Sequence, residues 1–302
     1  MELLWIPIAM GAGLMQAVRT AAQKALNARL GTWMVTYVRS LYGLPVMLLY
    51  LWIVLHFEGL GMPAMPAEYL FHCAMTALTQ VIATYLLILL FQMSNFAVGT
   101  MLTKTDIMQA AIIGTVLFSE TISLTGWIAI TLSVVGVILM SAGRAAGILG
   151  GGLLAAVFSR ATATGLASAF LFCLSYLFLR EASLTMEEGS TFYRGAWSVV
   201  VVTSMQVVCL GLWLAWKQRP EFTKLPGLFR PSVFIGVTSA LGSIGWFTSM
   251  AMQNASYVKA VGQTEVIFTL LIATLYFKER IKPVEYVGIA TIVASILLFV
   301  LY

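Results

Sequence analysis

MSNFAVGTMLTKTDIMQAAIIGTVLFSETI, residues 93–122, is matched without a gap by MQNASYVKAVGQTEVIFTLLIATLYFKERI, residues 252–281. The alignment places Asp106 of the first stretch opposite Glu265 of the second. Such self-similarity at a fixed offset is the signature of an internal repeat. The two stretches therefore indicate that the chain arose by duplication and has two related halves.

A second, shorter match has nearly the same offset and the same order along the chain. TYVRSLY at 36–42 aligns with TFYRGAW at 191–197, so that Arg39 corresponds to Arg194. One such match could arise by chance, but two in the same order and at nearly the same offset are much less readily explained by chance. The Gly-rich stretch between the halves is then the joint of the duplication.

The composition predicts a helical membrane protein. Of 302 residues, 60% are hydrophobic and 10% are charged, and the mean hydropathy is +0.94. Soluble domains carry about 25% charged residues, so this balance argues against a soluble enzyme, a disordered protein or a disulfide scaffold. An outer-membrane barrel would alternate apolar and polar residues in short segments, whereas the apolar runs here are long.

Ten apolar segments are long enough to cross a bilayer, since a spanning helix needs about 20 apolar residues. They are residues 3–23, 33–55, 68–91, 95–118, 124–142, 162–180, 190–216, 232–252, 257–277 and 284–302. We expect an all-α polytopic membrane protein with ten transmembrane helices.

The predicted organisation is a first five-helix repeat over 1–143, a Gly/Ala-rich connecting loop over 144–161 and a second five-helix repeat over 162–302. An odd number of helices in each half places the second half upside down relative to the first. This inverted repeat is the architecture of many secondary transporters, whose substrate site lies near the bilayer midplane between the halves.

Loop charges predict the orientation. Basic residues gather in the loops after the first, fifth, seventh and ninth segments: Lys24, Arg29, Arg144, Arg160, Lys217, Arg219, Lys224, Arg230, Lys278, Arg280 and Lys282. The opposite loops hold Arg180 and Arg194 beside Glu181, Glu187 and Glu188. The positive-inside rule places the first set in the cytoplasm and both termini outside the cell membrane. The basic residues are scattered, which argues against a nucleic-acid partner.

Ionisable residues also occur within the apolar segments, and they form the candidate site. Lys104 and Asp106 lie in the fourth segment, and Lys259, Gln263 and Glu265 lie in the ninth. A charged side chain at the bilayer centre costs at least about 2.5 kcal/mol, so such residues face water or one another. We predict that these five bind substrate. Two carboxylates in one low-dielectric cavity disfavour joint ionisation, which would allow one to carry a proton.

Other polar residues are candidates for lining the same path, although each has an equally ordinary structural interpretation. Glutamine often bonds across helices, and Tyr and Trp often lie at the membrane interface. The candidates are Gln16, Arg19, Gln80, Tyr85, Gln109, Tyr176 and Trp246. A structural role is expected for Arg39, Arg194, Glu120 and Glu279, which recur in both halves.

No enzyme, metal or cofactor motif is evident. The chain contains no phosphate-binding loop, HExxH or GxSxG. His56 and His72 flank one loop without a ligand partner at useful spacing, and Cys73, Cys173 and Cys209 lie in separate apolar segments. We therefore expect no catalytic residue, no metal and no cofactor.

The paired stretches LFSETISLTGWIAITLSVVGVILM (117–140) and YFKERIKPVEYVGIATIVASILLFV (276–300), with the aromatic-x-Arg of Tyr37 and Arg39 and of Phe192 and Arg194, show a family pattern. The pattern resembles EamA-type members of the drug/metabolite transporter superfamily. The resemblance implies ten helices, a central cavity and export or uptake of small metabolites. It also implies cytoplasmic termini, against the orientation that the loop charges predict.

The sequence departs from the family pattern at the site itself. Ser119 and Lys278 replace the usual Gly before the hairpin Glu, and Lys-Thr-Asp and Gln-Thr-Glu replace a frequent mid-helix Pro. These departures suggest a charged or zwitterionic substrate.

The leading hypothesis is an alternating-access secondary transporter of a small charged or zwitterionic metabolite, amino-acid-like or an organic ion, with proton coupling as an option. Its partners are then this small molecule, membrane lipid and protons, in a monomer or a homodimer. Two alternatives stay open: a lipid or lipid-linked flippase, and a membrane scaffold subunit that does not transport.

Overall fold

The computed structural model describes residues 3–93, 103, 105–145, 160–275 and 283–301. Regular structure in these ranges is helical, with no strand. The helices of the first half are α1 (Trp5–Leu26), α2 (Thr32–Leu41), α3 (Leu44–Glu58), α4 (Ala67–Met93), α6 (Asp106–Leu117) and α7 (Leu124–Ala145). Those of the second half are α9 (Arg160–Leu184), α10 (Thr191–Lys217), α11 (Arg219–Phe222), η1 (Pro226–Leu228), α12 (Phe229–Met252), α13 (Ala255–Val261), α14 (Thr264–Leu275) and α15 (Pro283–Leu301).

Five helical stretches of the described residues are long and apolar enough to cross a membrane. They are Thr32–Glu58, Ala67–Met93, Arg160–Leu184, Thr191–Lys217 and Pro226–Met252. Shorter apolar helices cover Asp106–Leu117, Leu124–Val137 and Tyr286–Leu298. The chain is therefore a multi-pass helical membrane protein.

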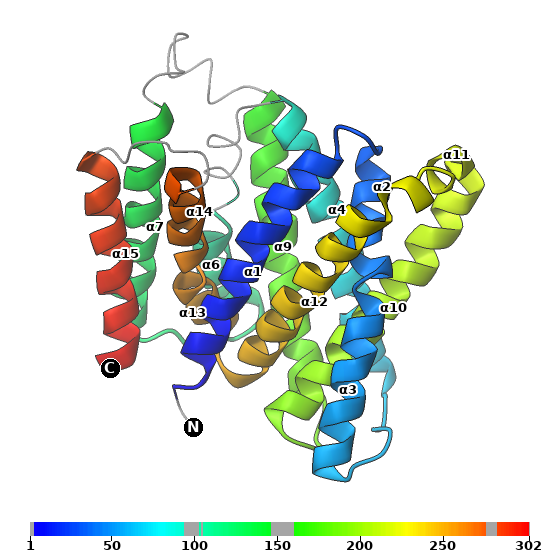
Figure 1. Ribbon diagram of the computed structural model, residues 1–302. Coiled ribbons are helices and arrows are strands. Elements are labelled where there is room, and N and C mark those ends of the chain that lie inside the picture. Colours follow the sequence, from blue (N-terminus) through cyan, green and yellow to red (C-terminus); the bar gives the residue numbers. More distant parts are fainter. Residues whose placement is uncertain (1–2, 94–102, 104, 146–159, 276–282, 302) are drawn as a thin grey trace.

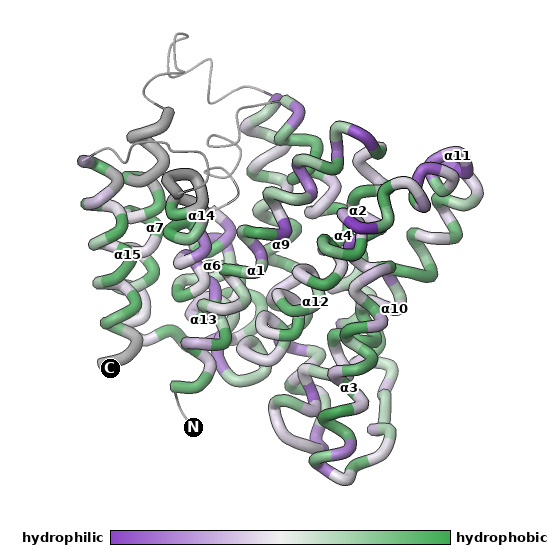
Figure 2. The backbone as a smooth tube through the Cα atoms, in the orientation of Figure 1, coloured by the Kyte–Doolittle hydropathy of each residue, from purple (hydrophilic) through white to green (hydrophobic). Residues whose placement is uncertain are grey.

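The outer surfaces of these helices are apolar, as lipid contact requires. Trp52 is 64% exposed on α3, Phe71 56% on α4 and Leu212 69% on α10. In water such side chains would be costly. Hydrophilic residues concentrate at the ends of the long helices and in the short helix α11 (Figure 2). A further hydrophilic group lies around α6 and α14.

Local sequence explains the main helix boundaries. Gly59 ends α3 with φ +66°, a left-handed conformation that glycine adopts without strain. Ser190 caps the N-terminus of α10, and its hydroxyl accepts hydrogen bonds from the backbone N–H groups of Phe192 and Tyr193. The second predicted segment is interrupted between α2 and α3, where Pro45 lies in the first turn of α3.

Helices from the two halves pack against one another in a reciprocal pattern. Helix α1 of the first half lies along α12 and against α14, which both belong to the second half (Figure 1). Likewise, α9 of the second half lies along α4 and against α6 of the first half. The first predicted segment of each half thus packs on the third and fourth predicted segments of the other half. The last helices of the two halves, α7 and α15, pack against each other, and both contact α13.

Small residues permit this close packing. A Cβ on Gly245 of α12 would lie 2.9 Å from the Cβ of Ala12 on α1. A Cβ on Gly13 of α1 would lie 3.0 Å from the carbonyl oxygen of Gly262. Close backbone approach at small residues is typical of helix contacts in membranes. It brings α1 directly against the segment that contains the predicted charged residues.

Candidate functional site

The ninth predicted helix is interrupted at the candidate site. The segment predicted as one helix over 257–277 is divided into α13 and α14, which meet at Gly262 and Gln263. A Cβ on Gly262 would lie 2.1 Å from Cη2 of Trp246, so only glycine fits beside this indole ring. Discontinuous helices of this kind form binding sites in many transporters.

Both predicted carboxylates lie at helix starts. Asp106 is the first residue of α6, and Glu265 lies in the first turn of α14. The positive end of the helix dipole favours a negative charge at this position. The two carboxylates that the duplication aligns therefore both lie at the start of a helix.

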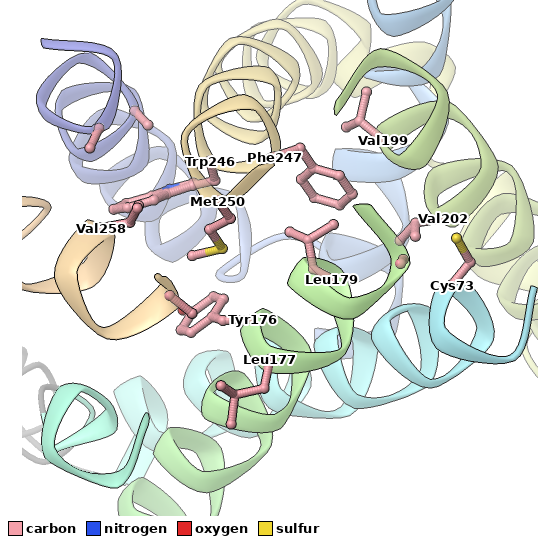
Figure 3. Packing of buried hydrophobic residues seen from close by; sticks show 14 of the residues in the cluster. Cys73, Tyr176, Leu177, Leu179, Val199, Val202, Trp246, Phe247, Met250 and Val258 are labelled. Carbon is pink, nitrogen blue, oxygen red and sulfur yellow. The ribbon is translucent and has the colours of Figure 1, made fainter. Parts of the chain in front are cut away.

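Lys259 of α13 is 2% exposed and meets groups from three other helices. Its Nζ lies 3.3 Å from Oδ2 of Asp106 and donates a hydrogen bond of 3.1 Å to the hydroxyl of Tyr176. The same ammonium lies 4.2 Å from the ring centroid of Tyr176 and 4.5 Å from that of Trp246. Figure 3 shows Trp246 extending from α12 toward Val258 of α13, with Tyr176 of α9 close by. The charge is thus held by one carboxylate and two aromatic rings.

Gln16 of α1 links the second carboxylate to the same cluster. Its Nε2 donates to Oε2 of Glu265 at 2.9 Å, and its Oε1 accepts from Nε1 of Trp246 at 2.9 Å. Because the indole can only donate, this contact fixes which end of the Gln16 amide faces Glu265. Gln16 therefore joins α1, α12 and α14 at one point.

Two small cavities lie beside these residues and share the walls Gln16, Phe172 and Tyr176. The first, which we call the acidic cavity, is also lined by Thr20, Leu87, Thr103, Asp106, Lys259 and Glu265. The second, which we call the arginine cavity, is also lined by Arg19, Arg39, Gln80, Leu179, Ser243, Trp246 and Phe247. Each has a volume of about 20 Å³, which is space for one water molecule.

The arginine cavity contains one residue that the sequence did not place there. Arg39, for which a structural role was expected, is 5% exposed and donates from Nη1 to Thr84 Oγ1 and from Nη2 to Gln80 Oε1, each at 2.7 Å. Gln206 Nε2 donates to the same Gln80 oxygen at 2.8 Å. The sequence signal was that Arg39 lies in an apolar segment and recurs as Arg194 in the second half. Its equivalent, Arg194, contacts only the Ser183 carbonyl oxygen at 3.5 Å within the described chain.

Three predicted site residues lie outside both cavities. Gln263 is buried at the interruption of the ninth segment, and its Nε2 lies 3.5 Å from the Lys259 carbonyl oxygen. Gln109 donates to Thr105 Oγ1 of its own helix at 3.2 Å. Tyr85 stacks on Trp33 with ring centroids 3.9 Å apart. Predicted residues Lys104 and Glu279 are outside the described ranges.

Several buried polar atoms at the two cavities or on the neighbouring helix turns have no hydrogen-bond partner among the described residues. They are Arg19 Nε, Asp106 Oδ1, Gln109 Oε1, Gln263 Oε1 and Thr264 Oγ1. An unpaired buried polar group costs about 1–3 kcal/mol, so native proteins keep few of them.

A second polar cluster joins the halves at the face where α1 begins and α15 ends (Figure 1). Glu120 Oε1 accepts from the backbone N–H of Ala255 at 3.1 Å and lies 3.1 Å from Nε of Arg180. Arg180 Nη1 also donates to the Met250 carbonyl oxygen at 3.0 Å. Asn254 Nδ2 donates to the Thr121 carbonyl oxygen at 3.0 Å. We call Glu120, Arg180 and Ala255 the lower clasp.

No group of three His, Cys, Asp or Glu side chains within the described ranges is placed to hold a metal ion. In the described part of the chain, the charged residues that line the two cavities are two carboxylates, two guanidinium groups and one ammonium. This set suits the binding of charged organic groups.

The fold and the site define a multi-pass helical membrane protein with a buried charged centre between two related halves. The model of the EamA-like transporter family matches residues 3–142 and again residues 159–301. The chain therefore belongs to the EamA-like transporter family, with two copies of the family's repeat.

A solved structure titled "Crystal structure of protein" is similar over its length, with a TM-score of 0.69 and 13% sequence identity. The match covers 100% of this chain and 97% of that one. At this identity the likeness concerns the fold alone. No curated protein matched the chain.

Proposed function

We propose that the chain moves a small charged or zwitterionic metabolite across the cell membrane by alternating access. The observation that carries the proposal is the acidic cavity, where Asp106, Lys259 and Glu265 meet. Its walls come from α1, α4 and α6 of the first half and from α9, α13 and α14 of the second. A substrate bound there contacts both halves, so relative motion of the halves changes its exposure.

The proposed topology is ten crossings in two inverted repeats. The reciprocal packing of α1 on α12 and α14 and of α9 on α4 and α6 supports an approximate two-fold relation between the halves. The start of α1 and the end of α15 lie on the same face (Figure 1), as an even number of crossings requires.

Transport requires the helices around the site to move apart. A cavity of about 20 Å³ holds one water molecule and no metabolite. At one face the halves are joined by the lower clasp. At the other, the Glu221 carboxylate of α11 accepts from the backbone N–H of Gly31 at 2.8 Å. Breaking either link would open that end, which is the motion that alternating access needs.

The proposed orientation is based on the charges at the two faces. Lys24, Arg29, Arg160, Lys217 and Arg219 lie at the helix ends of the face opposite the lower clasp (Figure 1). We propose that this face is cytoplasmic, because basic loops are retained there. The start of α1 and the end of α15 then lie on the extracytoplasmic side of the membrane.

Proton coupling is part of the proposal. Asp106 and Glu265 line one cavity with a single ammonium of the described residues. Protonation of one carboxylate when the substrate leaves would remove the repulsion between two negative charges in one low-dielectric cavity. Substrate and proton would then alternate at the same site.

The test is flux in proteoliposomes loaded with a pH-sensitive dye and exposed to succinate, alanine, putrescine or inorganic phosphate. We expect wild-type protein to carry at least one probe, and Asp106→Asn and Glu265→Gln to lose its transport. Glu187→Gln is the control, since it removes a carboxylate from an exposed surface position. Full flux in the Asp106→Asn, Glu265→Gln double variant overturns the proposal. Transport of a fluorescent phospholipid, with no transport of any soluble probe, overturns it as well.

A further inference from the structure

Three of the five charged side chains that line the two cavities, among the described residues, are basic. Arg19, Arg39 and Lys259 stand against Asp106 and Glu265, and Asp106 is already paired with Lys259. An uncompensated buried charge is costly in a low-dielectric interior. Among these described groups the surplus is positive, and it lies in the arginine cavity.

The arginine cavity contains no carboxylate among its lining residues. Arg39 is held by the neutral oxygens of Thr84 and Gln80. Arg19 is 4% exposed, and its Nε has no hydrogen-bond partner in the described part of the chain. Glu265 interacts with Arg19 electrostatically, but it forms no ion pair with Arg19 and lines the neighbouring cavity.

Two buried guanidinium groups around one cavity have the chemistry that binds an oxyanion. Each offers donors in a planar fork that matches a carboxylate or a phosphate. The contacts of Arg39 with Thr84 and Gln80 fix the orientation of its guanidinium. Arg19 has an unpaired donor and so can bond an incoming anion without breaking a protein hydrogen bond.

We propose that Arg19 and Arg39 form an oxyanion subsite, so that the substrate is a small organic anion whose carboxylate or phosphate lies between the two guanidinium groups. The remainder of the molecule extends past Gln16 and Tyr176 into the acidic cavity, because these residues line both cavities. The inference rests on the proposed transport function and narrows its substrate to molecules with net negative charge. A zwitterion would leave the positive surplus uncompensated.

The test is ligand-induced thermal stabilisation of the full chain in nanodiscs of phosphatidylcholine, at constant ionic strength set with chloride. The probes are succinate, inorganic phosphate, alanine and putrescine. A ligand that binds the folded state raises the midpoint of unfolding in proportion to its saturation. We expect succinate or phosphate to raise it by several degrees, with alanine and putrescine inactive.

Variants locate the effect. Arg19→Gln should raise the half-saturating anion concentration by about 30-fold or more, since it removes one partner of a buried charge contact. Arg19→Lys and Arg39→Lys keep the charge without the planar fork and should weaken binding less; they also serve if Arg19→Gln does not fold. Arg29→Gln is the matched control, because Arg29 is an exposed loop residue.

Equal anion stabilisation of wild type and Arg19→Gln would overturn the subsite, as would stabilisation by putrescine or alanine in preference to the anions, or by none of the probes. Loss of the succinate effect in nanodiscs containing phosphatidylglycerol would assign the subsite to a lipid headgroup and overturn a soluble substrate. The two proposals fail separately. Asp106-dependent flux of putrescine or alanine without anion binding would contradict only the oxyanion subsite. Arg19-dependent anion binding without flux would contradict only the transport function.

Discussion

Lys259 Nζ lies 3.3 Å from Asp106 Oδ2, and this contact joins α13 of the second half to α6 of the first. The two side chains are 2% and 5% exposed. Asp106 Oδ1 has no partner in the described chain. A buried pair of this kind contributes less through its own attraction than through the penalty that follows when one member is removed.

The pair should therefore be strongly coupled in a double-mutant cycle. Lys259→Met and Asp106→Asn each leave one buried charge uncompensated, and each should lower the free energy of unfolding by about 3–5 kcal/mol. The combined variant should lose much less than the sum of the two. Thermal unfolding in detergent measures the three values.

Lys217→Met is the control for that cycle. Lys217 also lies over an indole ring, 4.2 Å from the centroid of Trp216, but at an exposed position. Its removal should change stability by less than about 1 kcal/mol. Additive losses at Lys259 and Asp106 would show that the contact is not a coupled ion pair.

Gly262 lies at the interruption between α13 and α14 and packs closely against Trp246. Gly262→Ala places a methyl group where Cη2 of Trp246 lies 2.1 Å away. Overpacking in a dense core costs about 1–3 kcal/mol, and here it also displaces the ring above Lys259. We expect lower thermal stability and loss of transport, with partial recovery of stability in the Gly262→Ala, Trp246→Leu double variant.

Gly11→Ala is the matched change, because a Cβ at Gly11 meets nothing within 4 Å. It should preserve both stability and flux. If Gly262→Ala were tolerated as well as Gly11→Ala, the close contact with Trp246 would not be required at this position.

Sequence alone could predict that Asp106 and Glu265 occupy equivalent depths, because the repeat aligns them and both lie in apolar segments. It could also predict Gln16, Arg19, Gln80, Tyr176 and Trp246 as neighbours of one path, and the structure places all five on the arginine cavity. Their binding roles stay predictions. Polar residues in lipid-crossing segments must face inward, and that rule needs no tertiary information.

The approach of Arg39 to Arg19 could not be predicted in the same way. It depends on how α2 packs on α4, where Thr84 and Gln80 hold the guanidinium. The division of the ninth segment was also missed, since Gly262 lies in an apolar run that reads as continuous helix. The close contact of Gly262 with the Trp246 ring was missed too, because that ring comes from α12 and the contact is therefore a tertiary constraint.

The lower clasp should control opening at its face. Arg180→Gln removes the cation beside Glu120 and the donor to the Met250 carbonyl oxygen. Hydrogen bonds to charged groups contribute about 1.5–3 kcal/mol, so we expect faster hydrogen–deuterium exchange at Ala255 and a lower unfolding temperature. Peptide-resolved mass spectrometry measures the exchange over residues 253–261.

Arg194→Gln tests whether any arginine at that face would have the same effect. Arg194 makes only a 3.5 Å contact with the Ser183 carbonyl oxygen in the described ranges. Its replacement should leave exchange over 253–261 unchanged. Equal acceleration in both variants would contradict a specific link through Arg180.

The link at the opposite face should depend on pH through Glu221. Partial burial acts to raise the pKa of Glu221, but hydrogen bonds from the Lys224 ammonium and the Gly31 N–H outweigh it and hold that pKa below the ordinary 4.5. The unfolded chain keeps the ordinary value. The contribution of Glu221 to stability is therefore fully present above pH 4.5 and is lost as the pH falls through the lower pKa of the folded state.

Because Lys224 is half exposed, salt screens this interaction, and we expect it to contribute less than about 1 kcal/mol. Glu221→Gln should lower the unfolding temperature slightly at pH 7, and the difference from wild type should vanish in strong acid. Glu188→Gln, at an exposed position on the other face, should show no such difference at either pH. A difference between wild type and Glu221→Gln that persisted below the folded-state pKa would mean that the carboxylate charge does not hold α11 to Gly31.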